Sequence, residues 1–353
     1  MEILGVKHQK LFPTLKHVLE RGGVAVIPTD TVYGLLSRAD LASLNKLAKL
    51  KGKKDLKFAV FFDSTKTLSK YARLTSKTQK RSLDLLPGRL TLLFHPRGSY
   101  DFVYGGKIGA RVPKLDWLLQ FLREFGEPLA ATSANLHDEP VLRNLKELKR
   151  TFTGVDLIVN AGELDNRPST VLDLTTYPPV IRRLGSASIY EIEPVLKRKV
   201  KIDPNSYFSI LIVCTGNSCR SPMAVGYLKE KLKGMPVFVY SAGTIADLGL
   251  PAAENAITVM REMGIDISHH QSQPLSRELI IRSDLILVMQ PHHRERVLEL
   301  DPDAGPRTFL LRDFPKGGGI FDPIGGTVEV YRRCLQLMIP GLDRVAEEIR
   351  RRY

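Results

Sequence analysis

The chain has 353 residues, of which 43% are hydrophobic and 25% are charged, and its formal net charge is +14. This composition is typical of a folded globular protein with room for two domains, and it argues against a disordered or collagen-like chain. Three cysteines are too few for a disulfide framework, and the first ten residues contain no apolar signal segment. We therefore expect a cytoplasmic protein without a membrane partner.

The positive charge is concentrated in the first half of the chain. Residues 1–195 contain 30 Lys and Arg against 20 Asp and Glu, whereas residues 196–353 contain 22 against 18. Such an excess favours an anionic partner of the first half, such as a nucleotide or RNA. A solvated basic surface remains the alternative.

Helix and strand patterns alternate along residues 1–195. A mixture of this kind predicts an α/β domain with a mixed sheet. Predicted helices cover 12–21, a run capped by Asp40, 64–74, 76–86 and 115–125, and predicted strands cover 24–28, 58–62, 90–95, 108–112, 128–135, 157–159, 171–174 and 188–192.

A charged segment with two prolines, residues 194–206, separates the two halves. We expect a linker at 196–206 and a second domain at 207–353. The second half alternates strictly between strands (from 208, then 237–240, 284–289 and 308–311) and helices, and it ends in a long helix at 327–352. Strict alternation predicts a doubly wound parallel sheet with its site at the carboxyl ends of the strands.

The most informative stretch is FSILIVCTGNSCRSPM, residues 208–223. An apolar strand ends at Cys214, a polar loop follows, and Ser221-Pro222 opens a helix after Arg220. Loop N–H groups and a helix N-terminus attract anions, and the Arg220 fork matches phosphate oxygens. We expect the Cys214 thiol to have a lowered pKa there, with Ser221 as a hydrogen-bond donor to the thiolate. A buried Cys214 that only packs is the alternative.

Residues 213–222 resemble the signature of the low-molecular-weight protein phosphatases, V-C-x-G-N-x-C-R-S-P. The resemblance implies that Cys214 attacks phosphorus, that Asp322 in KGGGIFDPIGG is the general acid, and that no metal cofactor is needed. The alternative interpretation of Asp322 is a turn residue before proline. The candidate catalytic residues are Cys214, Arg220, Ser221 and Asp322, and the candidate phosphate-binding residues are Thr215, Gly216, Asn217, Ser218 and Cys219.

Two positions bear on the substrate, a phosphorylated protein. Ser218 and the run Ile324-Gly325-Gly326 resemble bacterial protein-arginine phosphatases more than tyrosine phosphatases. A small hydroxyl leaves room for a planar phosphoguanidinium, so we favour phosphoarginine over phosphotyrosine. A phospho-residue reader without turnover is a further alternative, and arsenate reductase is disfavoured because only Cys334 follows Cys219.

We expect the two other cysteines and the two histidine pairs to lie outside the catalytic chemistry, apart from a possible disulfide of Cys219. Cys219 is either a core residue or a thiol that forms a disulfide with Cys214 under peroxide. Cys334 is expected to pack inside the C-terminal helix. The pairs His269-His270 and His292-His293 are interpreted as surface or loop residues, because adjacent side chains point apart and no carboxylate spacing supports a metal site.

The first half resembles the YrdC-like threonylcarbamoyl-AMP synthase family over most of residues 10–193. The matching segments are IPTDTVYGL, KLKGKK, LPGRLTLLF, ARVP, ATSANL, RPSTVLDL and VIRRLG. The resemblance implies synthesis of threonylcarbamoyl-AMP from threonine, bicarbonate and ATP with Mg²⁺, for the t6A modification of tRNA, with RNA or proteins of that pathway as partners. A nucleotide- or RNA-binding module without catalysis is the alternative.

The resemblance also assigns roles to residues of the first half. Thr31 would hold threonine, Lys51 and Lys53 would face phosphates and carboxylate, Ser133 and Asn135 would bind the nucleotide, and Arg183 would close the site; Arg111 and Ser169 add donors. The family's K-x-R arginine is replaced by Lys53, which keeps the charge but loses the bidentate fork. Further departures from the family pattern are Lys54, Arg89 and His137-Asp138.

Overall fold

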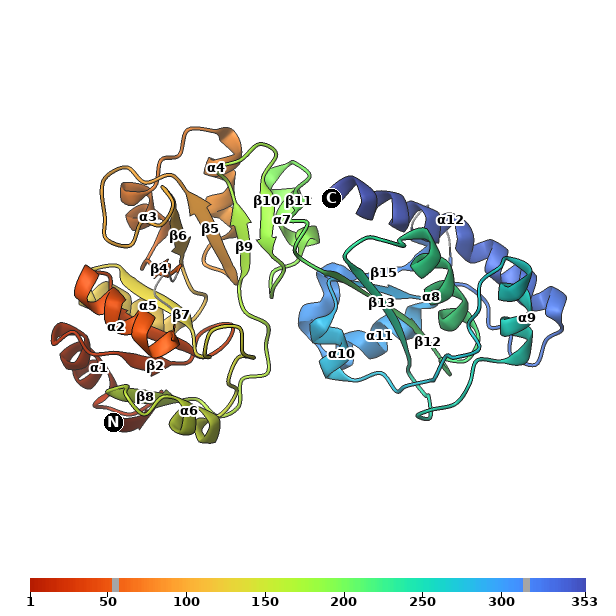
Figure 1. Cartoon of the computed structure of the whole chain (residues 1–353), viewed down its shortest axis with the longest axis horizontal. Helices are drawn as coiled ribbons and strands as arrows, with labels where there is room; N and C mark the ends of the chain where they lie inside the picture. Colours follow the sequence, from red (N-terminus) through yellow and green to blue (C-terminus); the bar gives the residue numbers. More distant parts are fainter. Residues whose placement is uncertain (53–56, 314–317) are drawn as a thin grey trace. The chain divides into compact units, whose positions relative to one another are not determined.

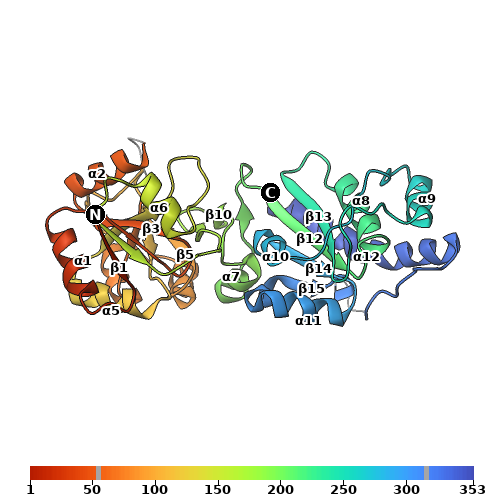
Figure 2. The same cartoon turned by 90° about the horizontal axis from the view of Figure 1, so that it is seen from below.

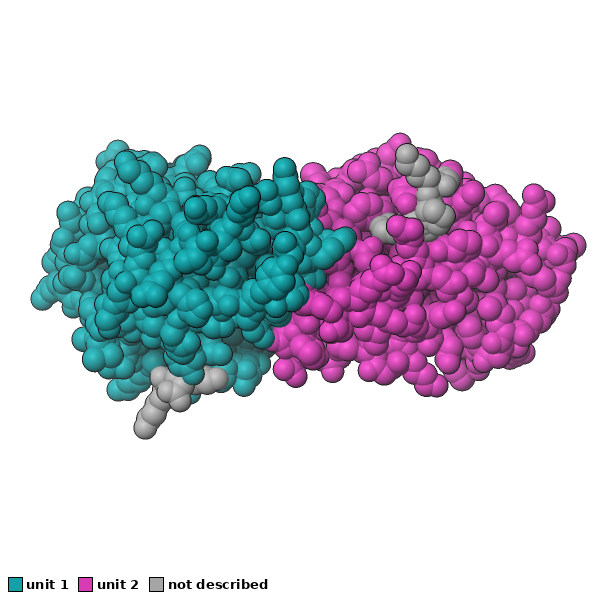
Figure 3. All heavy atoms as spheres, turned by 90° about the horizontal axis from the view of Figure 1, so that it is seen from above, with its two compact units in different colours: residues 1–187, 192–200 teal, residues 188–191, 201–353 magenta. Residues whose placement is uncertain are grey.

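The computed structural model describes residues 1–52, 57–313 and 318–353 (Figure 1). The chain forms two compact units, coloured separately in Figure 3. Unit 1 consists of residues 1–187 and 192–200, and unit 2 consists of residues 188–191 and 201–353. Within the described ranges, no helix combines the length and the apolar character that a membrane crossing requires.

Unit 1 is an α/β domain with a mixed sheet. Its strands are β1 (Glu2–Gly5), β2 (Ala25–Ile27), β3 (Gly34–Arg38), β4 (Ala59–Phe61), β5 (Leu90–Phe94), β6 (Ile108–Arg111), β7 (Leu129–Ser133), β8 (Leu157–Asn160), β9 (Thr170–Asp173) and β10 (Val180–Arg183). Its helices are α1 (Leu11–Glu20), α2 (Leu41–Lys51), α3 (Thr65–Tyr71), α4 (Lys77–Ser82), the 3₁₀ turn η1 (Leu83–Leu85), α5 (Asp116–Phe125) and α6 (Leu145–Thr151).

The sheet of unit 1 runs in the order β1-β8-β2-β3-β7-β4-β6-β5-β9-β10. Alternate residues of its strands are buried on opposite faces, as the period of two in a strand requires. Ala25 and Ile27 pack with α1 and α5, whereas Val24 and Val26 pack with residues of α2 and α6. Figure 2 shows these two pairs of helices on opposite sides of the strands.

Unit 2 contains a sheet whose neighbouring strands are all parallel, in the order β13-β12-β14-β15. The strands are β12 (Phe208–Cys214), β13 (Val237–Gly243), β14 (Leu285–Val288) and β15 (Thr308–Leu310). The helices are α8 (Arg220–Lys231), α9 (Glu254–Glu262), α10 (Arg277–Arg282), α11 (Pro291–Leu300) and α12 (Val328–Arg352), with 3₁₀ turns η2 (Pro302–Arg307) and η3 (Leu311–Asp313).

Helices cover both faces of the sheet in unit 2. Leu211 and Val213 of β12 pack with Ile280 of α10 and Val297 of α11. Helices α8, α9 and α12 pack together and α8 contacts β12 and β13. The predicted mixed sheet and the predicted doubly wound parallel sheet are therefore both confirmed.

Two features of the predicted elements differ from the structure. The predicted strand at 188–192 is wrong, because this segment begins helix α7 (Ile189–Leu196). The Ser188 N–H donates to the Glu191 carboxylate at 2.8 Å, which is half of a capping box, and the buried Ile189, Ile192 and Leu196 are spaced by three and four residues. The predicted linker at 196–206 contains the end of α7 and the short strand β11 (Lys201–Ile202).

Candidate functional site

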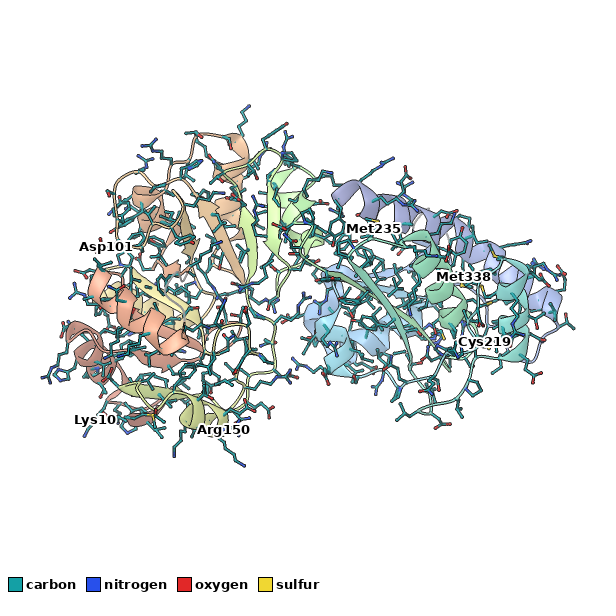
Figure 4. All side chains as sticks on the ribbon, in the orientation of Figure 1. Lys10, Asp101, Arg150, Cys219, Met235 and Met338 are labelled. Carbon is teal, nitrogen blue, oxygen red and sulfur yellow. The ribbon has the colours of Figure 1, made fainter. Side chains whose placement is uncertain are left out.

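The candidate site of unit 2 begins where β12 ends. β12 is a central strand, because it pairs with β13 on one side and with β14 on the other. Cys214 is the last residue of this strand and lies at its carboxyl end. A crevice at such a point, where neighbouring connections leave in opposite directions, is the usual ligand position in a doubly wound sheet. Helix α8 begins at Arg220, and Cys219 immediately precedes it (Figure 4).

Asn217 holds the loop between β12 and α8 in shape. Its φ is +53°, a conformation that asparagine tolerates better than most residues. Its Nδ2 donates to Ser221 Oγ and to Ser241 Oγ, both at 2.8 Å, and its Oδ1 accepts from Gln273 N at 2.9 Å. His270 Nε2 lies 2.7 Å from the Asn217 carbonyl oxygen and donates to it. Every polar atom of this buried amide is therefore used to fix the loop.

Cys214 is buried, with 2% of its surface exposed. Its Sγ lies 3.0 Å from Ser221 Oγ. Asn217 Nδ2 donates to Ser221 Oγ, and a thiolate sulfur can only accept, so the Ser221 hydroxyl donates to Cys214 Sγ once the thiol is ionised. This is the arrangement that a thiolate acceptor needs.

The predicted lowering of the Cys214 pKa is not what the structure gives. Burial raises the pKa of the Cys214 thiol, and the Ser221 hydrogen bonds and the charge of Arg220 only partly oppose that rise. Burial of the sulfur is therefore the main cause of the raised pKa. Arg220 also forms an ion pair with Asp322, so the loop and this carboxylate share its guanidinium.

Arg220 is held at both ends of its guanidinium and is 1% exposed. Nη1 donates to Gln290 Oε1 at 2.9 Å and to the Ile320 carbonyl oxygen at 3.1 Å. Nη2 donates to Thr215 Oγ1 at 3.0 Å and to the Asp322 carboxylate. Nε is buried and has no hydrogen-bond partner within the part of the chain that the structure describes. A buried donor of this kind is costly unless a ligand satisfies it, and a phosphoryl oxygen would do so.

Asp322 reaches the loop from the segment before α12. Its side chain is 33% exposed, and its Oδ1 accepts from Ile324 N at 3.3 Å while the other oxygen contacts Arg220. The carboxylate therefore binds the same guanidinium that would contact a phosphoryl group.

Ser218 and Cys219 lie on the outer part of the loop. Ser218 Oγ is 3.6 Å from Cys219 Sγ, and Cys219 Sγ is 3.2 Å from the Tyr331 hydroxyl of α12. Cys334, predicted to pack, is buried and its Sγ contacts the Phe321 carbonyl oxygen at 3.7 Å. All three cysteines are free thiols.

Several residues of this site were not predicted. The interpretation of the histidine pairs as surface or loop residues is wrong for His293, which lies in α11 and is fully buried beside Thr215. His270 is a half-buried loop residue, and its contact with Asn217 was not predicted. A Cβ at Gly243, which ends β13, would lie 2.5 Å from the Thr215 carbonyl oxygen, so only glycine fits there. Gly243 at the end of β13 and His293 shortly after β14 lie at the carboxyl edge of the sheet, where a ligand site is expected, but their contacts with the loop are not visible in local patterns.

The candidate ligand site of unit 1 contains a buried lysine. Lys51 Nζ, at the end of α2, donates to the Ser133 carbonyl oxygen at 2.9 Å and to Asn135 Oδ1 at 2.8 Å. Ser133 Oγ donates to the same Asn135 oxygen at 2.6 Å. Burial, and to a lesser degree the charge of Arg183, lowers the pKa of Lys51 to about 8. Lys53 and Lys54 lie outside the described residues.

Two arginines accompany Lys51. Arg111 Nη2 donates to Thr31 Oγ1 at 2.9 Å and pairs with Asp30, and its buried Nε has no partner among the described residues. Arg183 donates from Nε and Nη2 to the Ser169 carbonyl oxygen, at 3.1 and 2.7 Å. Burial, followed by the charges of Arg111 and Arg167, lowers the pKa of Arg183 to about 10. Mutual repulsion among these cations favours a bound anion.

Comparison with known proteins divides the chain in the same way as its geometry. Residues 17–185 match the family model described as telomere recombination, Sua5/YciO/YrdC. Residues 209–353 match the low molecular weight phosphotyrosine protein phosphatase family.

Two curated relatives match the second half. A protein-arginine-phosphatase of Geobacillus stearothermophilus is 42% identical over 145 residues, which are 40% of this chain and 96% of the relative. A probable low molecular weight protein-tyrosine-phosphatase, EpsP, of Ralstonia nicotianae is 38% identical over 142 residues, which are 40% of this chain and 96% of the relative.

A solved structure of a double variant of Sua5 from P. abyssi is 19% identical, with a TM-score of 0.53, and the match covers 88% of this chain and 98% of that one. This last similarity concerns the fold alone. The identity and coverage of the curated relatives establish the family of the second half. The chain therefore belongs to the low molecular weight protein phosphatase family through residues 209–353, and it carries a Sua5/YciO/YrdC domain over residues 17–185.

Proposed function

We propose that unit 2 is a cysteine-dependent phosphatase of phosphorylated proteins. The observation that carries this proposal is the buried, unpartnered Nε of Arg220 on the loop that starts at Cys214. The Cys214 thiolate attacks phosphorus, an S–P bond forms, and the bond from phosphorus to the leaving nitrogen or oxygen breaks. Asp322 takes up the proton that Cys214 loses when the substrate binds, and it gives this proton to the leaving atom. It then accepts a proton from the water that splits phosphocysteine into phosphate and thiolate.

We further propose that phosphoarginine is the preferred substrate. The small Ser218 side chain beside Cys219 leaves space in which a planar guanidinium fits, and its hydroxyl is a hydrogen-bond partner for that group. The similarity to a protein-arginine-phosphatase supports this choice, although relatives named as tyrosine phosphatases are nearly as similar. The deciding experiment is a comparison of kcat/KM on matched phosphoarginine and phosphotyrosine peptides.

The variant Ser218→Ile should shift this preference toward phosphotyrosine. We expect kcat/KM on the phosphoarginine peptide to fall about tenfold, since the larger hydrocarbon side chain of isoleucine crowds the guanidinium and lacks the hydroxyl that bonds it. Turnover of the phosphotyrosine peptide should be kept or raised. Ser218→Thr, which retains the hydroxyl, is the matched control. A wild-type protein that already prefers phosphotyrosine would refute the assignment.

For unit 1, we propose binding of ATP, threonine and bicarbonate and synthesis of threonylcarbamoyl-AMP, a step toward tRNA modification. The supporting observations are the buried Lys51, which donates to Ser133 and Asn135, the buried unpartnered Nε of Arg111, and Arg183, whose charge acts on Lys51. No group of three His, Cys, Asp or Glu side chains within the described ranges could hold a metal ion. Mg²⁺ would therefore be expected to arrive on the ATP phosphates.

The affinity of unit 1 for ATP should depend on pH through Lys51. With a pKa of about 8, Lys51 loses its proton between pH 7 and pH 9, so ATP should bind about tenfold more weakly at pH 9. The Lys51→Met variant should bind ATP weakly at both pH 7 and pH 9, and its affinity should not change between them, as measured by isothermal titration calorimetry. Lys49→Met, which removes an exposed charge from the same helix, is the matched control. Equal wild-type affinity at the two pH values would contradict the prediction.

Catalysis by unit 1 is tested separately from binding. Pyrophosphate release from ATP that requires both threonine and bicarbonate would support the synthase. Binding of ATP without such release would leave unit 1 as a nucleotide-binding module, in line with the replacement of the family arginine by Lys53.

A further inference from the structure

His293 is a fully buried histidine that the proposed reaction does not use. It lies in the first turn of α11, and its Nδ1 accepts a hydrogen bond from Gln290 N at 3.1 Å. Its Nε2 lies 3.0 Å from Thr215 Oγ1. Burial, followed by the charges of His292 and Arg220, lowers the pKa of His293 to about 3, so the ring is neutral at ordinary pH.

The direction of the His293–Thr215 hydrogen bond follows from these contacts. A neutral imidazole carries one N–H, and because Nδ1 accepts, the proton must be on Nε2. His293 therefore donates to Thr215 Oγ1. The same oxygen accepts from Arg220 Nη2 at 3.0 Å, so both of its lone pairs are used.

A single turn of chain thus holds both terminal nitrogens of Arg220. Gln290, which precedes α11, accepts from Nη1 at 2.9 Å through its side chain. His293, three residues later, holds the hydroxyl that accepts from Nη2. With Nη1 and Nη2 fixed in this way, Nε remains as the buried donor without a partner in the described parts of the chain.

We propose that His293 is a positioning residue that orients Arg220 for the phosphoryl group through Thr215. This inference rests on the proposed phosphatase function. A guanidinium that is already fixed in one plane binds a tetrahedral oxyanion more tightly, because binding does not have to order the arginine side chain. Without the His293 donor, the Thr215 hydroxyl can rotate, and Nη2 loses a fixed acceptor.

The test measures oxyanion binding and turnover in the full chain. Inorganic phosphate is used as a competitive inhibitor, and para-nitrophenyl phosphate is used as substrate. We expect His293→Leu to weaken phosphate inhibition about tenfold and to lower kcat/KM by a similar factor. His293→Gln, which keeps an N–H donor, should recover most of both. His292→Leu, on the exposed neighbouring ring, should behave as wild type.

A second variant tests the same contact from the other side. Thr215→Val removes the His293 hydrogen bond and the acceptor of Arg220 Nη2 together, so its loss should be at least that of His293→Leu. The double variant should be no worse than Thr215→Val alone, since His293 acts only through Thr215. Additive losses, or a His293→Gln protein as weak as His293→Leu, would overturn the inference. If His293→Leu does not fold, Thr215→Val decides alone, and unchanged phosphate inhibition in it would overturn the inference.

A different result would refute the phosphatase proposal itself. A wild-type protein that neither hydrolyses para-nitrophenyl phosphate nor is inhibited by phosphate would refute the proposed function and the inference with it. A wild-type protein that does both, with variants that match it, would refute only the role of His293.

Discussion

Replacement of Cys214 by serine should abolish hydrolysis of para-nitrophenyl phosphate, with kcat lowered about ten-thousandfold or more. A serine hydroxyl has a far higher pKa than a thiol, and the neighbour at 3.0 Å, Ser221 Oγ, is a donor rather than a base. Phosphate should still bind, because Arg220 and the loop N–H groups are unchanged. The measurement is the initial rate beside a phosphate titration.

The matched control for this variant is Cys334→Ser. Cys334 is also buried, but its Sγ contacts the Phe321 carbonyl oxygen, which a serine hydroxyl can also reach. Most of the turnover should remain. If Cys214→Ser kept the wild-type rate, the nucleophile would be another group. If the wild-type protein bound phosphorylated peptides and never turned over, unit 2 would be a reader of phosphorylated residues.

Local signals explain why the loop of unit 2 could be predicted from the sequence. The β-branched run before Cys214 and the Ser-Pro pair at the start of α8 are adjacent in the chain, so strand, loop and helix could be recognised together. The alternation of strands and helices after residue 208 likewise predicted a parallel sheet, because parallel neighbours need a crossover.

Residues that reach the loop from other strands could not be predicted in this way. Ser241 lies on β13, while Gln290 and His293 follow β14. Their contact with the loop depends on the order and register of the strands, which local patterns do not contain. The raised pKa of Cys214 has the same origin, because the depth of burial is set by the packing of the whole unit.

In unit 1 the predictions failed where local patterns are short or ambiguous. Strand β3 (Gly34–Arg38) was not predicted, and it pairs with β2 and β7 through a five-residue run that begins with glycine. Residues 188–191, which belong to unit 2, begin a segment so short that a strand and a helix start look alike. The Ser188–Glu191 contact and the spacing of the buried Ile189, Ile192 and Leu196 distinguish them.

Asp322→Asn should separate two roles of one carboxylate. We expect kcat on a phosphoarginine peptide to fall about 10²- to 10⁴-fold, because asparagine cannot give a proton to the leaving nitrogen. Phosphate affinity should rise about two- to fivefold, because the variant removes the ion pair with Arg220 that competes with phosphate. The gain is small because a partly exposed ion pair contributes little free energy.

The leaving group provides the sharpest control for this prediction. Para-nitrophenolate leaves readily without a proton, so Asp322→Asn should lower kcat much less on para-nitrophenyl phosphate than on phenyl phosphate. An equal loss on both substrates would mean that Asp322 shapes the loop and does not act as the acid. Unchanged phosphate affinity would mean that the Arg220–Asp322 pair does not hold the guanidinium away from its ligand.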